Sequence, residues 1–267
     1  IGEDMKDYFP ISIEDGVTFD GGNNTITIDD LGTDGNGDEI GWEGLFIPVS
    51  GQDSSTLIDF TIQNINFVLD GANVTGGHGC ILASSYDGTN PNLRFDYFSV
   101  TIDNCHTSAT NSAKISDSNC GGICGNALGR SNSTGTITNC ENHIPISGSG
   151  AGGICGGYFR GSISDCDNYG AISGNQAGGI CGQYAGKDTS LEISNCNNSG
   201  EISGDYAGGI CGQYAGYSGT LTISNCTNEA TGTISGDYAG GICGQYADNY
   251  EIVNCSNSGD IVGTYAG

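Results

Sequence analysis

The chain has little positive charge. Only 6 of its 267 residues are Lys or Arg, against 31 Asp or Glu, and the formal net charge is −25. A nucleic-acid partner requires a Lys- and Arg-rich surface that neutralises phosphates, so this composition excludes nucleic acid. The same charge repels anionic lipid surfaces and polyuronate chains. Cations, neutral glycans and other copies of the chain remain as partners.

Long apolar runs and helical periodicity are also missing. No stretch approaches the ~18 consecutive apolar residues of a membrane span, and apolar residues never recur at helical spacing over several turns. The 48 Gly and only 4 Pro follow no Gly-X-Y period, which excludes a collagen-like chain. Regularly placed Ile and Val argue against disorder. We therefore expect a folded, all-β protein.

What the sequence does contain is an internal repeat. The string ISGDYAGGICGQYA occupies residues 202–215 and recurs letter for letter at 234–247, with looser copies at 146–159 and 172–185. Each unit holds three β-prone runs, typified by LTISNC, GTISG and AGGICG, separated by the turn formers Asn, Gly, Ser and Asp. Three short strands in roughly thirty residues predict a parallel β-helix (β-solenoid). We expect about nine coils in a rod roughly 40 Å long.

Coils of a β-helix lie about 4.8 Å apart, so each side chain rests on its counterpart one coil earlier. The sequence predicts three columns of Ile in a narrow triangular core, with Gly where the backbone turns corners. The columns are Ile137, Ile163, Ile193, Ile223 and Ile252; Ile146, Ile172, Ile202, Ile234 and Ile261; and Ile123, Ile154, Ile180, Ile210 and Ile242. We expect a single domain over 1–267, irregular in 1–119 and regular in 120–267.

The repeat resembles a known motif. The run GGICGQYAG…TLTISNCTN…GTISGDYAGGICG is similar to the GLUG motif, a bacterial-type repeat written roughly GGLVG…I.NCYATG.VSG. The resemblance covers about residues 120–267 and implies a secreted or cell-surface, adhesin-like protein. The chain departs from the motif in one respect, because the residue after GG-Ile is Cys in every copy.

Regular spacing of the 13 Cys favours an oxidising, extracellular compartment. Pairing within a unit uses every cysteine except Cys120, but vertical neighbours also meet the Cα range of a disulfide, and stacked free thiols are a third arrangement. The within-unit pairs are Cys80–Cys105, Cys124–Cys140, Cys155–Cys166, Cys181–Cys196, Cys211–Cys226 and Cys243–Cys255. Strand alternation places Ile223 and Cys226 on opposite faces, so within-unit pairing requires a turn or bulge between them.

Several polar patterns are candidate sites. Six sequons also point to secretion, at Asn23, Asn73, Asn132, Asn197, Asn225 and Asn254. The run TDGNGDE places Asp34, Asn36 and Asp38 at alternating positions, as at the start of a calcium loop, although Leu45 stands where such a loop has Glu. Calcium at these residues is the one cofactor that the sequence suggests.

Enzymatic activity is not expected, and no catalytic residue is assigned. The GHG at 77–79 and the pair Asp29–Asp30 resemble motifs of polygalacturonase-type β-helix hydrolases, which use paired carboxylates. Their spacing exceeds one coil, however, and the net charge opposes polyuronates.

Two other residue types form columns. Tyrosines repeat at Tyr184, Tyr214 and Tyr246 and at Tyr206, Tyr238 and Tyr265, as a packing ladder or as a surface that stacks on sugar rings. The Asn of the I-x-N-C pattern predicts a hydrogen-bonded ladder at a turn. Its members are Asn139, Asn195, Asn225 and Asn254, with Asp165 in the same column.

The expected function is structural. No pattern of a capping helix precedes Val17 or follows Ile261, and an uncapped β-helix exposes unpaired backbone groups. We therefore expect an extracellular protein that assembles head to tail into a filament or surface appendage. An adhesin-type stalk that binds glycans or receptors through residues 80–120 is the alternative, and a polysaccharide-active enzyme is a third.

Overall fold

The computed structural model describes residues 11–28, 44–48, 58–71, 73–74, 79–82, 98–126 and 133–267. Every regular element in these ranges is a β-strand, and the strands pair in parallel from coil to coil. The expected all-β parallel β-helix is therefore confirmed. The calcium candidates Asp34, Asn36 and Asp38 and the sequon residue Asn132 lie outside the described residues.

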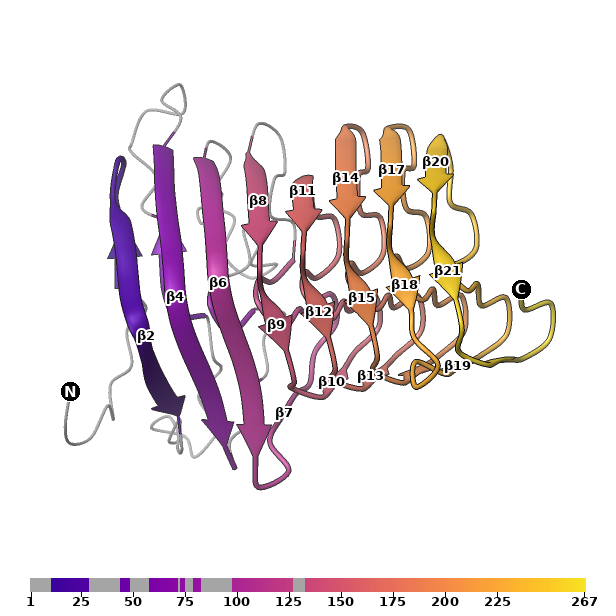
Figure 1. The fold of residues 1–267 in the computed structure, drawn as a ribbon, viewed down its shortest axis with the longest axis horizontal. Helices are drawn as coiled ribbons and strands as arrows, with labels where there is room; N and C mark the ends of the chain where they lie inside the picture. The colour runs from indigo at the N-terminus through magenta and orange to yellow at the C-terminus, as the bar shows by residue number, and fades with distance from the viewer. Residues whose placement is uncertain are drawn as a thin grey trace, which may run out of the picture.

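The longest sheet has 13 strands and runs along the whole molecule (Figure 1). It begins with three long strands, β2 (Thr18–Ile28), β4 (Ile58–Asp70) and β6 (Phe98–Thr110). Each later coil contributes two shorter strands in place of one, so that β6 pairs with both β8 and β9. These are β8 (Thr134–Thr138) and β9 (Glu141–Asn142), β11 (Gly161–Ser164) and β12 (Asp167–Asn168), β14 (Ser190–Ser194) and β15 (Asn197–Asn198), β17 (Thr220–Ser224) and β18 (Thr227–Asn228), and β20 (Tyr250–Val253) and β21 (Ser256–Asn257).

A second sheet of seven strands forms another side of each coil. Its strands have two residues each: β5 (Asn73–Val74), β7 (Lys114–Ile115), β10 (Ile146–Ser147), β13 (Ile172–Ser173), β16 (Ile202–Ser203), β19 (Ile234–Ser235) and β22 (Ile261–Val262). A separate pair joins β1 (Ile11–Ile13) to β3 (Phe46–Pro48). The GGIC segments form no strand and are held by isolated parallel bridges, such as Cys181 to Cys211.

The three Ile columns lie as the repeat predicts. Ile193 pairs in register with Ile163 and Ile223, and Ile202 pairs with Ile172 and Ile234. In the third column the N–H of each Ile from Ile123 to Ile210 donates to the carbonyl of the Ile one coil later. Except for Ile242, Ile252 and Ile261 in the last coil, the Ile side chains of the columns are buried, so coil-on-coil stacking of apolar side chains builds the core.

In the later coils a left-handed residue separates the two shorter strands, and it is Asn in every such coil except that of β11 and β12, where it is Asp165. Asn225 has a φ of 53°, and Asn139 and Asn195 have 54°. This turn resets the strand alternation, so Ile223 and Cys226 both face the core. The exposed amides form the expected ladder, in which Asn225 Nδ2 donates to Asn195 Oδ1 at 3.3 Å. Asn suits this position because its short polar side chain tolerates positive φ.

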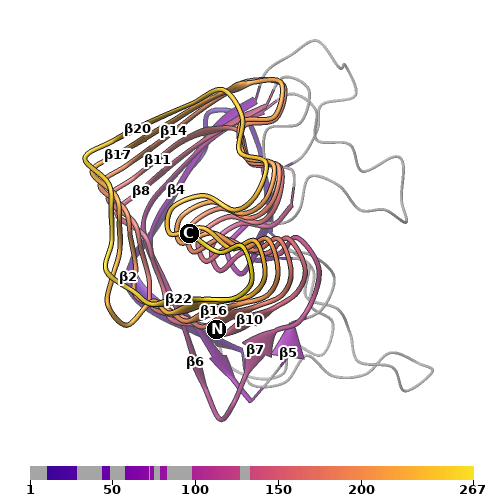
Figure 2. The same cartoon turned by 90° about the vertical axis from the view of Figure 1, so that its right-hand side faces the viewer.

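The cross-section is pinched inward and not triangular as expected (Figure 2). The C-terminal Gly267 pairs with Gly241 of a GGIC segment, and the end-on view places that terminus near the middle of the coil. Segments outside the strands contact each other between coils. Gln176, which follows β13, donates its Nε2 to Oε1 of Gln213, which follows the GGIC segment of the next coil, at 2.5 Å. Except at the last coil, the backbone of the next coil lies so close to the two Gly before each Ile that neither position has room for a Cβ.

Candidate functional site

Two columns of cysteine run along the interior. Bridges in register join Cys124, Cys155, Cys181, Cys211 and Cys243, called here the GGIC column. The second column follows the left-handed Asn and contains Cys105, Cys140, Cys166, Cys196, Cys226 and Cys255, called here the NC column. All are thiols, and all except Cys243 and Cys255 are buried.

Two cysteines lie outside these columns, in places that the sequence did not predict. Leu82, not Cys80, precedes Cys124 in the GGIC column, because the register of this early coil differs by two residues. Cys120 precedes the bridged Gly121 as Ala151 precedes Gly152, so it occupies the position of the buried Ala of later coils. Within-unit pairing of Cys80 and Cys105 therefore joins a residue outside the GGIC column to one in the NC column.

The NC thiols form a repeated hydrogen-bond pattern. Cys196 Sγ donates to the Ser194 carbonyl at 3.2 Å, and the N–H of Cys196 donates to Cys226 Sγ at 3.4 Å. The same pair of bonds recurs at Cys140, which donates through its N–H to Cys166 Sγ at 3.4 Å. Burial raises the pKa of the Cys140 and Cys155 thiols well above their ordinary value, because the interior disfavours a thiolate.

An inward column of asparagine is a feature that sequence reasoning missed. Asn142, Asn168, Asn198 and Asn228 are fully buried, two positions after the NC cysteine of each coil. Asn198 Nδ2 donates to the Gly200 carbonyl at 2.9 Å and to Asn228 Oδ1 at 2.7 Å, while its Oδ1 accepts from Asn168 Nδ2 at 2.8 Å. These bonds satisfy the buried amides and tie each coil to the next.

The tyrosine columns pack as ladders. The rings of Tyr184 and Tyr214 are stacked with centroids 4.8 Å apart and 6° between their planes, and Tyr206 and Tyr238 stack at 5.3 Å. Each ring face inside a column is therefore covered by another ring. The rings at the ends of the columns, such as Tyr206, Tyr246 and Tyr265, have a described ring on one side only. Sugar stacking along the whole column does not fit this geometry.

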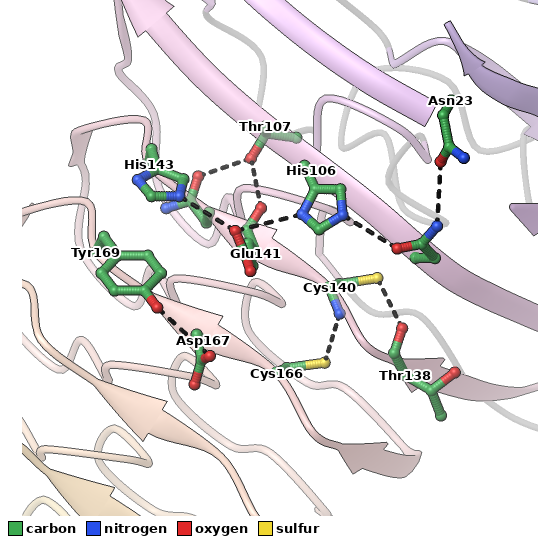
Figure 3. Close-up of polar contacts among 12 residues, drawn as sticks. Asn23, His106, Thr107, Thr138, Cys140, Glu141, His143, Cys166, Asp167 and Tyr169 are labelled. Atoms are coloured by element: carbon green, nitrogen blue, oxygen red, sulfur yellow. Dashed lines mark hydrogen bonds and ion pairs between the residues drawn. The ribbon is translucent and has the colours of Figure 1, made fainter. Parts of the chain in front are cut away.

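A cluster of polar side chains lies on the outer face where β6, β9 and β12 meet (Figure 3). Glu141 Oε2 lies 3.4 Å from both His106 Nδ1 and His143 Nε2, and His106 Nε2 lies 3.1 Å from Asn104 Oδ1. The ring of His143 stacks on Tyr169 at 4.5 Å. Burial, followed by the charges of Asp167 and Glu141, raises the pKa of Tyr169.

This cluster supports little chemistry. Its side chains are part-exposed on a sheet surface, where an ion pair is worth about 0–1 kcal/mol. Among the residues that the structure describes, no three His, Cys, Asp or Glu side chains form a metal-binding group. The same part of the chain contains no helix with the length and apolar character needed to cross a bilayer.

A shallow groove follows the outside of the seven-stranded sheet. Its volume is about 300 Å³, and it extends over successive coils from Lys114 to Ser235. Hydroxyls of Ser147, Ser173 and Ser203 line it in register. The groove therefore presents one hydroxyl per coil, parallel to the axis.

The described sequon residues lie in hydrogen-bonded ladders. Asn225 and Asn254 are exposed, and each donates its Nδ2 to the Asn one coil earlier at 3.3 Å. Asn197 donates to Asp167 Oδ1 at 2.8 Å, whereas Asn23 accepts from Asn104 at 3.2 Å. Asn73 lies in β5. A glycan on the Nδ2 of Asn225 or Asn254 removes a donor hydrogen, so glycosylation there competes with the ladder.

Comparison with protein-family models, with curated proteins and with solved structures finds no match to this chain. The GLUG resemblance remains a prediction from the repeat pattern.

Proposed function

We propose that this chain is an extracellular structural protein, which assembles head to tail into a filament or surface appendage. The observation that carries the proposal is the in-register stacking of near-identical coils, in which each coil covers the apolar side chains of the one before it. Ile252 is 37% exposed and Tyr265 77%, whereas Ile223, which precedes Ile252 in its column, is fully buried.

A second copy has the means to cover these side chains. At the opposite end, β2 pairs with β4 alone among the described strands, and its other edge is the one that a second copy meets in this proposal. Exposed strand edges pair readily with other chains. A contact between unlike ends does not close on itself, so it grows into a filament.

Charge in the last coil is expected to stop assembly. Ile252→Lys places an ammonium group in the core column where the next coil stacks, while Thr220→Lys adds the same charge on the exposed side of β17. We expect the wild type and Thr220→Lys to form elongated particles as concentration rises, and Ile252→Lys to remain monomeric. Sedimentation velocity and electron microscopy measure this. A wild-type protein that stays monomeric at every concentration contradicts the proposal.

Glycan binding along the serine groove is a second function that we propose, supported by its regularly spaced hydroxyls. The net charge of −25 favours a neutral, linear polysaccharide over an anionic one. Ser173→Asp and Ser203→Asp together are expected to abolish binding on an array of linear neutral glycans, and Ser194→Asp on the other sheet to leave it unchanged. A wild-type protein that binds no such glycan contradicts this second function.

A further inference from the structure

The cysteines of each column lie in register, one coil apart. Parallel bridges place Cys155 between Cys124 and Cys181, and Cys211 between Cys181 and Cys243. The vertical neighbours of each cysteine therefore lie in the coils directly above and below it.

Within-unit partners belong to different columns. Cys211 is bridged to Cys181 and Cys243, whereas Cys226 Sγ accepts from the N–H of Cys196. A disulfide between columns therefore joins two different segments of the coil, whereas one inside a column joins residues that are already in register.

The side chains of the NC column already lean along the axis. The N–H of Cys140 donates to Cys166 Sγ, and that of Cys226 donates to Cys255 Sγ, both at 3.4 Å, so each sulfur points toward the preceding coil. Cα atoms in register lie about 4.8 Å apart, inside the range of roughly 4.4–6.8 Å that disulfides occupy. Rotation about χ1 of the cysteine side chain in the preceding coil brings the two sulfurs together.

We propose that the cysteines of each column form disulfides between consecutive coils, along the axis of the β-helix. Two thiols lose two protons and two electrons as the S–S bond forms, and a small disulfide such as oxidised glutathione takes them up to become two thiols. The inference deepens the proposed function and rests on it in one respect, because an extracellular compartment supplies the oxidant. Bonds in this direction tie each coil to the next, which strengthens a rod against being pulled apart.

The number of cysteines in a column predicts how many thiols remain free after oxidation. The GGIC column has five members, Cys124, Cys155, Cys181, Cys211 and Cys243, so one thiol always remains after full oxidation. Each interior cysteine has two equivalent neighbours, so Cys181 pairs with Cys155 in some molecules and with Cys211 in others. Within-unit pairing instead gives Cys181 a single partner, Cys196.

Oxidation must occur while the chain folds into coils. The thiols of Cys155 and Cys211 are fully buried in the finished fold. Burial also raises the pKa of Cys155, and a thiolate is the reactive form. The test therefore starts from the unfolded chain.

The experiment refolds the reduced full-length chain in a mixture of reduced and oxidised glutathione. After alkylation and cleavage at Asp and Glu, non-reducing peptide mapping identifies the cross-links. We expect links between consecutive members of a column, with both Cys155–Cys181 and Cys181–Cys211 present. Links such as Cys211–Cys226, or a refolded protein with every cysteine still a thiol, overturn the proposal.

Two variants sharpen the result. Cys181→Ala divides the GGIC column into the pairs Cys124–Cys155 and Cys211–Cys243, so the number of free thiols per denatured chain falls by one. Under within-unit pairing the same variant releases Cys196, and the number rises by one. Cys196→Ala is the control, since it adds one free thiol under either arrangement. The wild-type map decides the question if a variant fails to fold.

This outcome is separate from the proposed function. Filaments built from a chain with within-unit links leave the structural role standing and remove only the axial disulfides. Axial links in a chain that never assembles leave the disulfide inference standing and remove the proposed filament.

Discussion

Gly208→Ala is expected to destabilise the fold by about 3 kcal/mol or more, because the added methyl group has no space. A Cβ at this position lies 2.1 Å from the Cys211 carbonyl oxygen and 2.4 Å from the Gly244 backbone nitrogen. Gly244 belongs to the next coil, so two coils have to separate. Urea or guanidinium unfolding of the purified protein measures the loss.

Gly267→Ala is the matched control. It occupies the equivalent repeat position in the last coil, and no atom lies within 4 Å of an added Cβ. We expect its stability to agree with wild type within about 0.5 kcal/mol. Equal stability of Gly208→Ala and wild type would show that the coils are not packed as closely as described.

Asn198→Asp is expected to destabilise the protein by about 3 kcal/mol near neutral pH. An ionised Asp still accepts from Asn168, but its second oxygen then faces the Gly200 carbonyl and Asn228 Oδ1, which now accept hydrogen bonds at 2.9 and 2.7 Å. The buried site holds no compensating cation among its described partners. The charge is therefore unfavourable.

The loss depends on pH in a defined direction. Burial without a cation raises the pKa of the new carboxyl in the folded state above its unfolded value of about 3.9. The penalty is smallest below about pH 4, where both states are protonated, and grows with pH until the folded pKa is passed. Asn257→Asp occupies the same repeat position but is exposed, so its stability should change little with pH. A flat pH profile for Asn198→Asp would contradict the buried ladder.

Repetition made the Ile columns predictable. Ile193 and Ile223 occupy equivalent places in near-identical strings, and stacked coils leave one arrangement for them. A turn before Cys226 was predicted only as a requirement of within-unit pairing, and Asn225 was placed in a hydrogen-bonded ladder at a turn. The left-handed conformation of Asn225, which makes the turn, was not predicted.

The buried Asn column was missed because Asn is usually exposed. A signal was present. Asn198 and its equivalents never vary, while the preceding position changes from Asp167 to Asn197 to Thr227. A polar residue that repeats beside a variable one is paired with its own copies in the coils above and below.

The inward fold and the early coils could not be predicted. The pinch depends on contacts between segments that form no strand. One example is Gln176 with Gln213, two residues that lie 37 positions apart in the sequence. The two-residue shift that puts Leu82 in place of Cys80 arises in a coil with no close copy in the sequence.

Methyl NOE spectroscopy of the Ile-labelled protein tests the vertical register most directly. In-register stacking predicts cross-peaks between Ile163 and Ile193 and between Ile193 and Ile223. It predicts none between Ile163 and Ile223, which lie two coils or about 9.6 Å apart. Absence of the first two cross-peaks, or a strong third one, would contradict the β-helix and the structural role derived from it.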